Sequence, residues 1–233
     1  MMKRPVDLEL FYKKKSGVVT DGLVSWIDGQ DELTVVSENN GICNVATIVD
    51  RVDGEECTAK QISGTMNKGI FSKEDSFFKQ EASYYHGVTI TISKETAKTA
   101  KTIEAIISSE NASNGLNSKL KIGENIVFSG RNANTSVNYF GSSFSIPYPF
   151  APLHIVGTIE NGISTIYVNG VKGTAGTNAS EFNVTSLFSI DYDTYYTYKA
   201  VQKIGAIRLY DRGLTESEIM QNYNYEKSLG RVD

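Results

Sequence analysis

The chain has 233 residues, of which 40% are hydrophobic and 21% are charged, and its formal net charge at pH 7 is −4. This length predicts one large domain, with two small domains as the alternative, and the composition is that of an ordinary soluble globular protein. The small negative charge excludes nucleic acid as the expected partner. No stretch approaches the roughly 18 apolar residues of a transmembrane helix, so we expect no membrane insertion.

Residues 1–20 are predicted to form an N-terminal arm, and residues 21–230 are predicted to form one domain because no break in composition divides them. The arm carries the basic run Lys13–Lys15, and short charge runs of this kind are usually solvated. Its first residues have no continuous apolar core and do not read as a signal peptide. We therefore expect a soluble protein that is made in the cytoplasm without a leader.

The first part of the domain reads as short strands joined by tight turns. Residues 22–33 (GLVSWIDGQDEL) predict a strand that breaks at the turn Asp28-Gly29. Residues 42–49 and 57–62 flank an acidic turn centred on Asp53-Gly54, which is the pattern of a β-hairpin.

Two further strands are predicted in the middle of the chain. Residues 88–92 (VTITI) alternate between apolar and polar side chains, as a half-buried strand does. The polar residues 93–101 predict a crossover. In the strand that follows, Ile103, Ala105 and Ile107 are expected to share one face.

The clearest meander covers residues 153–172 (LHIVGTIENGISTIYVNGVK). Ile155 and Ile159 are expected on the core face of its first strand. Asn161-Gly162 predicts a type I′ turn, and Asn169-Gly170 predicts the next turn.

The C-terminal residues 203–227 (KIGAIRLYDRGLTESEIMQNYNYEK) predict a last strand, a tight turn and one short helix. Thr215 is a suitable N-cap, and Glu218 three residues later completes a capping box. Leu214 and Ile219 are placed as a hydrophobic staple around this cap.

The meander and the closing segment resemble laminin-G-like domains of the concanavalin A-like lectin/glucanase superfamily. The resemblance rests on HIVGTIENGISTIYVNG, on IRLYDRGLTESEI, and on the opening GLV-aromatic strand, in that order along the chain. It implies an all-β fold: a two-sheet antiparallel jelly-roll sandwich of the concanavalin A type with a short C-terminal α-helix. In such a fold the first and last strands are expected to pair.

No catalytic constellation is visible in the sequence. Glucanases of this superfamily carry Glu-x-Asp-x-x-Glu on one strand, where alternate carboxylates can flank a glycosidic bond, and this spacing does not occur here. His86 and His154 have the surroundings of structural or surface residues, and no phosphate-binding loop occurs. We therefore expect that the protein is not an enzyme.

Cys43 and Cys57 match no zinc spacing and could either pair or stay reduced.

The strongest candidate for ligand binding is the segment SIDYDTYYTYKAV, residues 189–201. Carbohydrates are bound by stacking on aromatic rings together with hydrogen bonds from polar groups, and this segment supplies both. The candidate residues are Asp191, Tyr192, Asp193, Tyr195, Tyr196 and Tyr198. The alternative is a strand whose tyrosines divide between two faces. Residues 147–150 (PYPF) form a second aromatic-rich segment.

Many members of the family hold Ca²⁺ through loop oxygens at the rim of the sandwich. The resemblance therefore implies Asp191 and Asp193 as two of the several oxygen ligands that a calcium ion needs. The alternative is that these carboxylates only solvate a loop.

The leading functional hypothesis is a non-catalytic recognition module that binds carbohydrate, or a glycan-bearing cell surface, through rim loops. Single sites of this kind are weak, so a homo-oligomer would strengthen binding through repetition. The alternative is a structural or decoration protein of a bacteriophage virion (capsid, tail or fibre), docked by its N-terminal arm onto other virion proteins.

Overall fold

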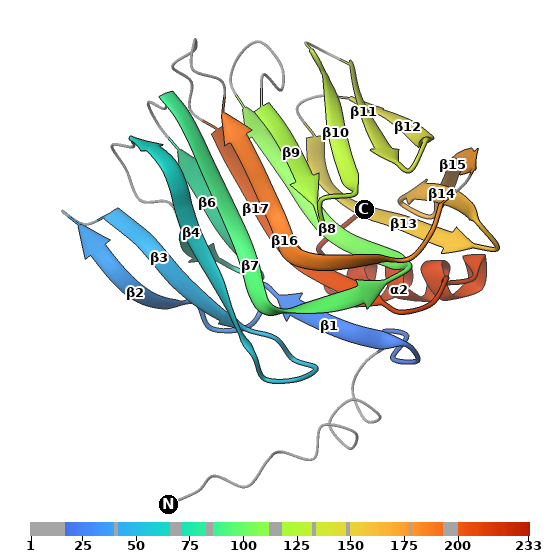
Figure 1. Cartoon of the computed structure of the whole chain (residues 1–233), viewed down its shortest axis with the longest axis horizontal. Coiled ribbons are helices and arrows are strands. Elements are labelled where there is room, and N and C mark those ends of the chain that lie inside the picture. The colour runs from blue at the N-terminus through green and yellow to red at the C-terminus, as the bar shows by residue number, and fades with distance from the viewer. Residues whose placement is uncertain are drawn as a thin grey trace, which may run out of the picture.

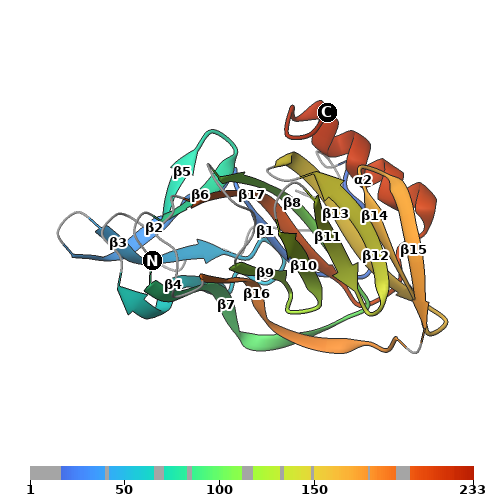
Figure 2. The same ribbon diagram turned by 90° about the horizontal axis from the view of Figure 1, so that it is seen from above.

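The computed structural model describes residues 17–39, 42–65, 71–82, 86–111, 118–131, 134–147, 150–177, 179–192 and 200–233. In this part the chain forms two antiparallel β-sheets that pack face to face, and helix α2 (Glu216–Ser228) lies on the outer side of one of them (Figures 1 and 2). This arrangement confirms the jelly-roll sandwich with a C-terminal helix. In the described residues, no helix combines the length and the apolar character that a membrane crossing requires.

The sheet beneath α2, here called the helix-covered sheet, has eight strands in the order β15, β14, β13, β8, β17, β6 and β5, with β1 pairing β17 beside β6. Its strands are β1 (Leu23–Asp28), β5 (Phe71–Glu74), β6 (Phe77–Ala82), β8 (Thr102–Asn111), β13 (Phe150–Glu160), β14 (Ile163–Val168), β15 (Val171–Thr177) and β17 (Ala200–Tyr210).

The other sheet, here called the open sheet, has nine strands in the order β12, β11, β10, β9, β16, β7, β4, β3 and β2. Its strands are β2 (Thr34–Asn39), β3 (Ile42–Val49), β4 (Glu56–Thr65), β7 (His86–Ala100), β9 (Ser118–Ile122), β10 (Ile126–Arg131), β11 (Asn134–Tyr139), β12 (Ser142–Pro147) and β16 (Phe182–Tyr192).

The hydrophobic core lies between the two sheets because each central strand turns its alternate apolar side chains inward. On β8, Ile103, Ala105 and Ile107 are buried in this core, as the sequence predicted. Ile155 and Ile159 on β13 join them, again as predicted. The open sheet contributes the facing side chains Ile48, Ile90, Ile92, Phe188 and Ile190.

The first and last strands of the domain pair, as the resemblance implied. β1 runs antiparallel to the second half of β17, with Trp26 opposite Arg208. Both predicted turns of the meander are also confirmed. Asn161 and Gly162 have φ angles of 50° and 77°, and positive φ at both central positions is what a type I′ turn requires.

The start of α2 follows the predicted cap. Thr215 Oγ1 accepts a hydrogen bond from the Glu218 backbone N–H at 3.3 Å, and the Glu218 carboxylate accepts one from the Thr215 N–H at 2.8 Å. Leu214 and Ile219 lie in the same buried cluster, which confirms the staple.

Residues 17–20, which the sequence assigned to the arm, pack against α2. The Val19 backbone N–H donates to Asn222 Oδ1 at 2.7 Å, and Gln221 Nε2 donates to the Gly17 carbonyl at 2.9 Å. The folded unit therefore includes these residues. The rest of the predicted arm, residues 1–16, lies outside the described part of the chain.

The polar crossover predicted at residues 93–101 is wrong, because β7 continues as a strand to Ala100. This stretch pairs with the start of β16, with Ala100 opposite Phe182 and Lys98 opposite Val184. Lys94 is 5% exposed and is paired with a buried carboxylate. A run of lysines and threonines thus forms a strand because one of its charges is neutralised inside the protein.

One side of the sandwich is closed where the edge strands β12 and β15 meet. Thr174 Oγ1 accepts a hydrogen bond from the Ser143 backbone N–H at 2.8 Å and donates one to the Ser143 carbonyl at 3.2 Å. The backbone at Gly176 approaches so closely that an added Cβ would lie 2.2 Å from the Phe140 carbonyl oxygen. Only glycine fits at this contact.

Replacing Gly176 with alanine is expected to lower the free energy of unfolding by about 2–3 kcal/mol, because two backbones must separate to admit the methyl group. Urea unfolding followed by circular dichroism measures this change. Val171→Ala, on the same strand with a side chain 59% exposed, is the control, and we expect it to change stability by less than about 0.5 kcal/mol. Equal stability of the Gly176→Ala variant and the wild type would contradict the close approach.

Candidate functional site

In the described residues, a group of buried titratable side chains lies between α2 and the helix-covered sheet. It is here called the buried charge cluster and consists of Asp28, Glu104, His154, Arg208, Glu226 and Arg231, each at most 1% exposed. Asp28, Glu104, His154 and Arg208 alternate along their strands with the core residues, so they lie on the outer face of the helix-covered sheet. Glu226 comes from α2, which lies over this face (Figure 2), and Arg231 follows α2.

Glu104 is the centre of the buried charge cluster. Its carboxylate accepts hydrogen bonds from Arg208 Nη1 at 2.9 Å, Tyr210 Oη at 3.1 Å and Asn222 Nδ2 at 2.8 Å. His154 Nε2 lies 2.8 Å from its Oε1 atom. Burial alone would raise the pKa of Glu104, but the Arg208 charge and the hydrogen bond from His154 lower it to about 2.

The cluster also ties the C-terminal segment to the first strand. Arg208 binds the Glu226 carboxylate of α2, and Arg231 donates to Glu226 at 3.1 Å and to Asp28 on β1. The Trp26 ring lies under the Arg208 guanidinium, 4.7 Å from its centroid. All these groups are closed to solvent and paired with one another, so the cluster holds the fold together and offers no access to a substrate.

A smaller buried ion pair lies in the acidic turn between β3 and β4. Asp50 is fully buried, and its carboxylate accepts hydrogen bonds from Lys94 Nζ at 2.6 Å and from the Val52 N–H at 2.8 Å. Cys57 nearby is a free thiol whose pKa burial raises to about 12. The side chain of Cys43 lies outside the described part.

The predicted ligand segment begins at the end of β16. The backbone of Asp191 and Tyr192 forms the last two positions of this strand, and residue 191 pairs with Thr89 on β7 and Lys119 on β9. The remaining predicted residues, Asp193, Tyr195, Tyr196 and Tyr198, lie outside the described residues.

Several strands end or begin at this rim, here called the tyrosine rim. β17 begins at Ala200, opposite Ala82 at the end of β6 and Asn111 at the end of β8, and β9 begins beside the end of β16. The rim is therefore where the connections β6–β7, β8–β9 and β16–β17 leave the two sheets (Figure 1). The described residues include no group of three or more His, Cys, Asp or Glu side chains placed to hold a metal ion.

A row of polar side chains crosses the outer face of the open sheet next to this rim. Lys60 on β4 lies opposite Thr91 on β7, and Thr91 lies opposite Ser189 on β16. Ser189 in turn lies opposite Lys121 on β9. These four residues are here called the hydroxyl strip. Ser189 is two positions before Asp191 on β16, so the strip adjoins the tyrosine rim.

The hydroxyl strip has unused hydrogen-bonding capacity. Thr91 is only 7% exposed, and its Oγ1 atom, which has no hydrogen-bond partner, is itself closed to solvent. Ser189 beside it is half-buried. Among the described residues, neither Lys60 nor Lys121 has an ion-pair partner. Sequence reasoning missed this strip, although the alternation in VTITI placed its threonines on the face opposite the core.

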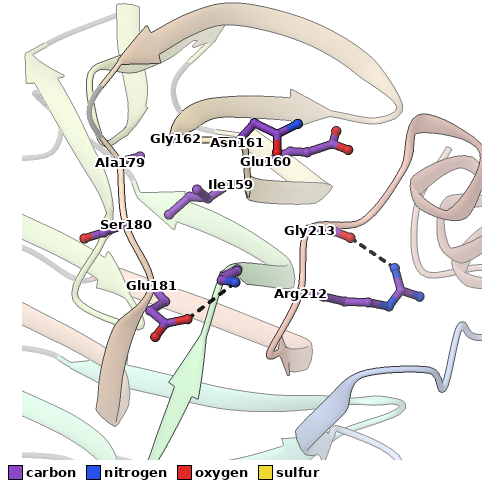
Figure 3. Close-up of a pocket in the computed structure, with 10 residues that line it drawn as sticks. Ile159, Glu160, Asn161, Gly162, Ala179, Ser180, Glu181, Arg212 and Gly213 are labelled. Atoms are coloured by element: carbon purple, nitrogen blue, oxygen red, sulfur yellow. Dashed lines mark hydrogen bonds and ion pairs between the residues drawn. The ribbon is translucent and has the colours of Figure 1, made fainter.

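A hollow of about 360 Å³ lies at the other end of the sandwich (Figure 3). It is lined by Lys101, Ile159, Glu160, Asn161, Gly162, Ala179, Ser180, Glu181, Arg212 and Gly213. β16 starts here beside Ala100 and runs away from the hollow to the tyrosine rim.

The charges of the hollow are mostly used within the protein. Lys101 Nζ lies 3.4 Å from the Glu181 carboxylate, and Arg212 pairs with Glu218 at 2.6 Å. The lining holds no aromatic side chain on which a sugar could stack. In the described residues the side chains of Glu160 and Ser180 form no hydrogen bond. The hollow is therefore a polar depression without a surface for sugar stacking.

Comparison with known proteins gives both a family and a set of similar folds. The family model for the concanavalin A-like lectin/glucanases superfamily matches residues 82–220, which is more than half of the chain. A search of curated protein sequences found no match.

Two solved structures resemble the fold at low identity. The Trypanosoma rangeli sialidase in complex with 2,3-difluorosialic acid has a TM-score of 0.57 and 16% identity, over 93% of this chain and 35% of the sialidase. A botulinum neurotoxin type C, whose cell entry depends on interaction with two ganglioside molecules, has a TM-score of 0.52 and 12% identity, over 87% of this chain and 51% of the toxin chain. The chain thus spans about a third and about half of these proteins, and the likeness shows the fold.

Proposed function

Because the chain belongs to the concanavalin A-like lectin/glucanase superfamily, we propose that it is a non-catalytic recognition module that binds carbohydrate at the tyrosine rim and the adjoining hydroxyl strip. The fold hosts proteins of several functions, so the proposal needs support from a site. The single observation that carries it is the hydroxyl strip, whose free polar groups lead along β16 to the segment richest in tyrosine and aspartate.

The chemistry of the strip suits a ligand with many hydroxyl groups. Ser189, which is half-buried, can donate to or accept from a sugar hydroxyl, and Lys60 and Lys121 can donate to sugar oxygens. Because neighbouring strands lie about 4.8 Å apart, the two lysines are separated by about 14 Å, so the ligand that reaches both must be extended.

The tyrosines of the adjoining segment would supply the apolar part of the contact. We place sugar stacking on Tyr195 and Tyr196, with Tyr192, Tyr198 and the carboxylates of Asp191 and Asp193 as the polar partners. Support comes from the fold neighbours, because the neurotoxin interacts with gangliosides and the sialidase binds a sialic acid derivative. Both of those ligands are glycans or glycan-bearing molecules.

Two double variants test the placement on a glycan array and, for any glycan found, by calorimetry. Lys60→Ala with Ser189→Ala removes two polar groups of the strip, and Tyr195→Ala with Tyr196→Ala removes two rings of the rim. Each is expected to weaken binding tenfold or more, because a lost hydrogen bond or ring contact is worth about 1 kcal/mol. Unfolding curves of each variant check that the fold is intact.

The matched control lies in the hollow at the opposite end. Glu160→Gln with Ser180→Ala changes two polar side chains that form no hydrogen bonds in the described structure, and we expect it to leave glycan binding unchanged. Loss of binding in this control, or full binding in both double variants, would move the site elsewhere.

The same array run with calcium and then with a chelator tests the metal. Binding that disappears with the chelator would assign Asp191 and Asp193 as calcium ligands, whereas binding in both conditions would remove the ion from the proposal. If no glycan binds even when the protein is presented multivalently, carbohydrate recognition fails, and a structural role in a virion or another assembly becomes the better proposal.

A further inference from the structure

The ion pair of Lys94 and Asp50 is short and closed to solvent. Lys94 lies on β7, Asp50 directly follows β3, and both side chains are 0% exposed. The Lys94 Nζ atom lies 2.6 Å from Asp50 Oδ2. Because a C–O bond adds about 1.2 Å, Nζ is at most about 3.8 Å from the carboxyl carbon, which is close to the separation of two reacting atoms.

The hydrogen bonds around Asp50 distinguish its two carboxylate oxygens. Oδ1 accepts from the Trp26 N–H at 3.1 Å and from the Val52 N–H at 2.8 Å. Two fixed backbone donors on one oxygen stabilise the negative charge that develops there when a nucleophile attacks the carbon. Oδ2 accepts instead from the Ser25 hydroxyl and from Lys94. Oδ2 is therefore the oxygen that can take up protons and leave.

A second carboxylate lies beside the amine. Lys94 Nζ also donates to Asp53 Oδ2 at 3.2 Å, and the Asp53 side chain is 28% exposed. Burial opposes the charge on Lys94, but the hydrogen bond and the charge of Asp50 prevail and raise the pKa of its ammonium group. The neutral amine is thus formed only when a carboxylate in contact with it takes the proton. Asp53 can do this without being consumed.

We propose that Lys94 and Asp50 condense to an amide that crosslinks β7 to the turn after β3 inside the folded protein. The Lys94 Nζ atom attacks the Asp50 carboxyl carbon, so that a C–N bond forms and the bond from this carbon to Oδ2 breaks. Of the three ammonium protons, one stays on the amide nitrogen and two pass by way of Asp53 to Oδ2, which leaves as water. The reaction needs no oxidant and no other reactant. This inference does not depend on carbohydrate binding.

Burial favours this reaction at Lys94 and Asp50 and not at other ion pairs of the protein. Two buried ions have lost their hydration, and a buried ion pair is often no more stable than uncharged groups in its place. The amide is uncharged, and its oxygen keeps both N–H donors of Oδ1. Lys172 and Glu216 lie at nearly the same separation, 2.7 Å, but their side chains are 54% and 65% exposed. Both of those ions stay hydrated, so we expect no crosslink between them.

Mass spectrometry of the full chain, denatured and reduced, tests the crosslink. We expect a mass below that of the sequence by about 18 Da, the mass of one water molecule. Trypsin should fail to cleave after Lys94, and tandem spectra should show one branched peptide that contains both Asp50 and Lys94. Cleavage after Lys172 in the same digest is the internal control. A chain that has the full mass of its sequence and is cleaved after Lys94 overturns the proposal.

Two variants separate the crosslink from other losses of water. Lys94→Arg keeps a positive charge but cannot form the amide, and we expect its mass to equal that of its sequence. A loss of water that persists in this variant lies elsewhere, for example in a succinimide at an Asp-Gly pair, and overturns the proposal.

Asp53→Asn removes the proton carrier. We expect it to slow the formation of the crosslink at least about tenfold, measured by mass at intervals after cell-free synthesis. Equal rates in this variant and the wild type would overturn the role of Asp53.

Discussion

Replacing Glu104 with glutamine is expected to lower the free energy of unfolding by about 3–5 kcal/mol, because it leaves buried cations with too little negative charge. Arg208 is fully buried and keeps only Glu226 as a carboxylate partner in this variant. A glutamine has nearly the shape of the glutamate, so the loss reports charge pairing and not the creation of a cavity. A change of this size is a large part of the total stability of a domain.

Equilibrium unfolding in urea measures the effect of Glu104→Gln. The matched control is Glu216→Gln, which removes the partner of Lys172 in an exposed ion pair of 2.7 Å. We expect this control to cost far less than Glu104→Gln, because ion pairs on the surface generally contribute little to stability. If Glu104→Gln and Glu216→Gln are equally stable, the buried charge cluster does not hold the helix in the way described.

The protein is expected to keep its stability down to about pH 5 and to lose it steeply as the pH falls from about 4.5 to 2. The pKa of Glu104, Glu218 and Asp53 is lowered to about 2 in each case, and that of Asp28 is lowered as well. For Glu104 and Asp28, burial opposes the shift, and the charges and hydrogen bonds of Arg208 and Arg231 prevail. A carboxylate with a lowered pKa stabilises the fold above its unfolded-state pKa, and this contribution disappears as the folded-state carboxylate becomes protonated.

Urea midpoints at closely spaced pH values give this profile. The Glu104→Gln variant provides the control, because it lacks the main titrating group of the cluster and should show a shallower fall below about pH 4.5. A loss of stability already complete between pH 7 and pH 5, or an equal slope in the variant and the wild type, would contradict the assignment to these carboxylates.

The elements that were predictable from sequence are those whose signals are local. The Asn161-Gly162 turn needs positive φ at two successive residues, and few residue pairs other than Asn-Gly allow this readily. The capping box of α2 is formed by Thr215 and Glu218, which lie three residues apart. In these cases the residues that form the contact are neighbours in the chain.

The features that could not be predicted depend on partners far away in sequence. Lys94 lies in a polar run that reads as a loop, and it is buried because Asp50, 44 residues earlier, neutralises it. Glu104 and Asn222 are 118 residues apart, so nothing near either one signals their contact. The hydroxyl strip is likewise an arrangement of four strands, and only the register reveals it. The tyrosine segment remains a prediction from sequence.

The position of β17 has a consequence for how the protein folds during its synthesis. β17 lies inside the helix-covered sheet, between β8 on one side and β6 and β1 on the other. β1 therefore has no strand partner until residues 200–210 leave the ribosome, and a ribosome adds only about 5–20 residues per second. We expect β1 to remain without its strand partner for many seconds while the rest of the chain is synthesised. Folding is therefore expected to be slow and largely post-translational.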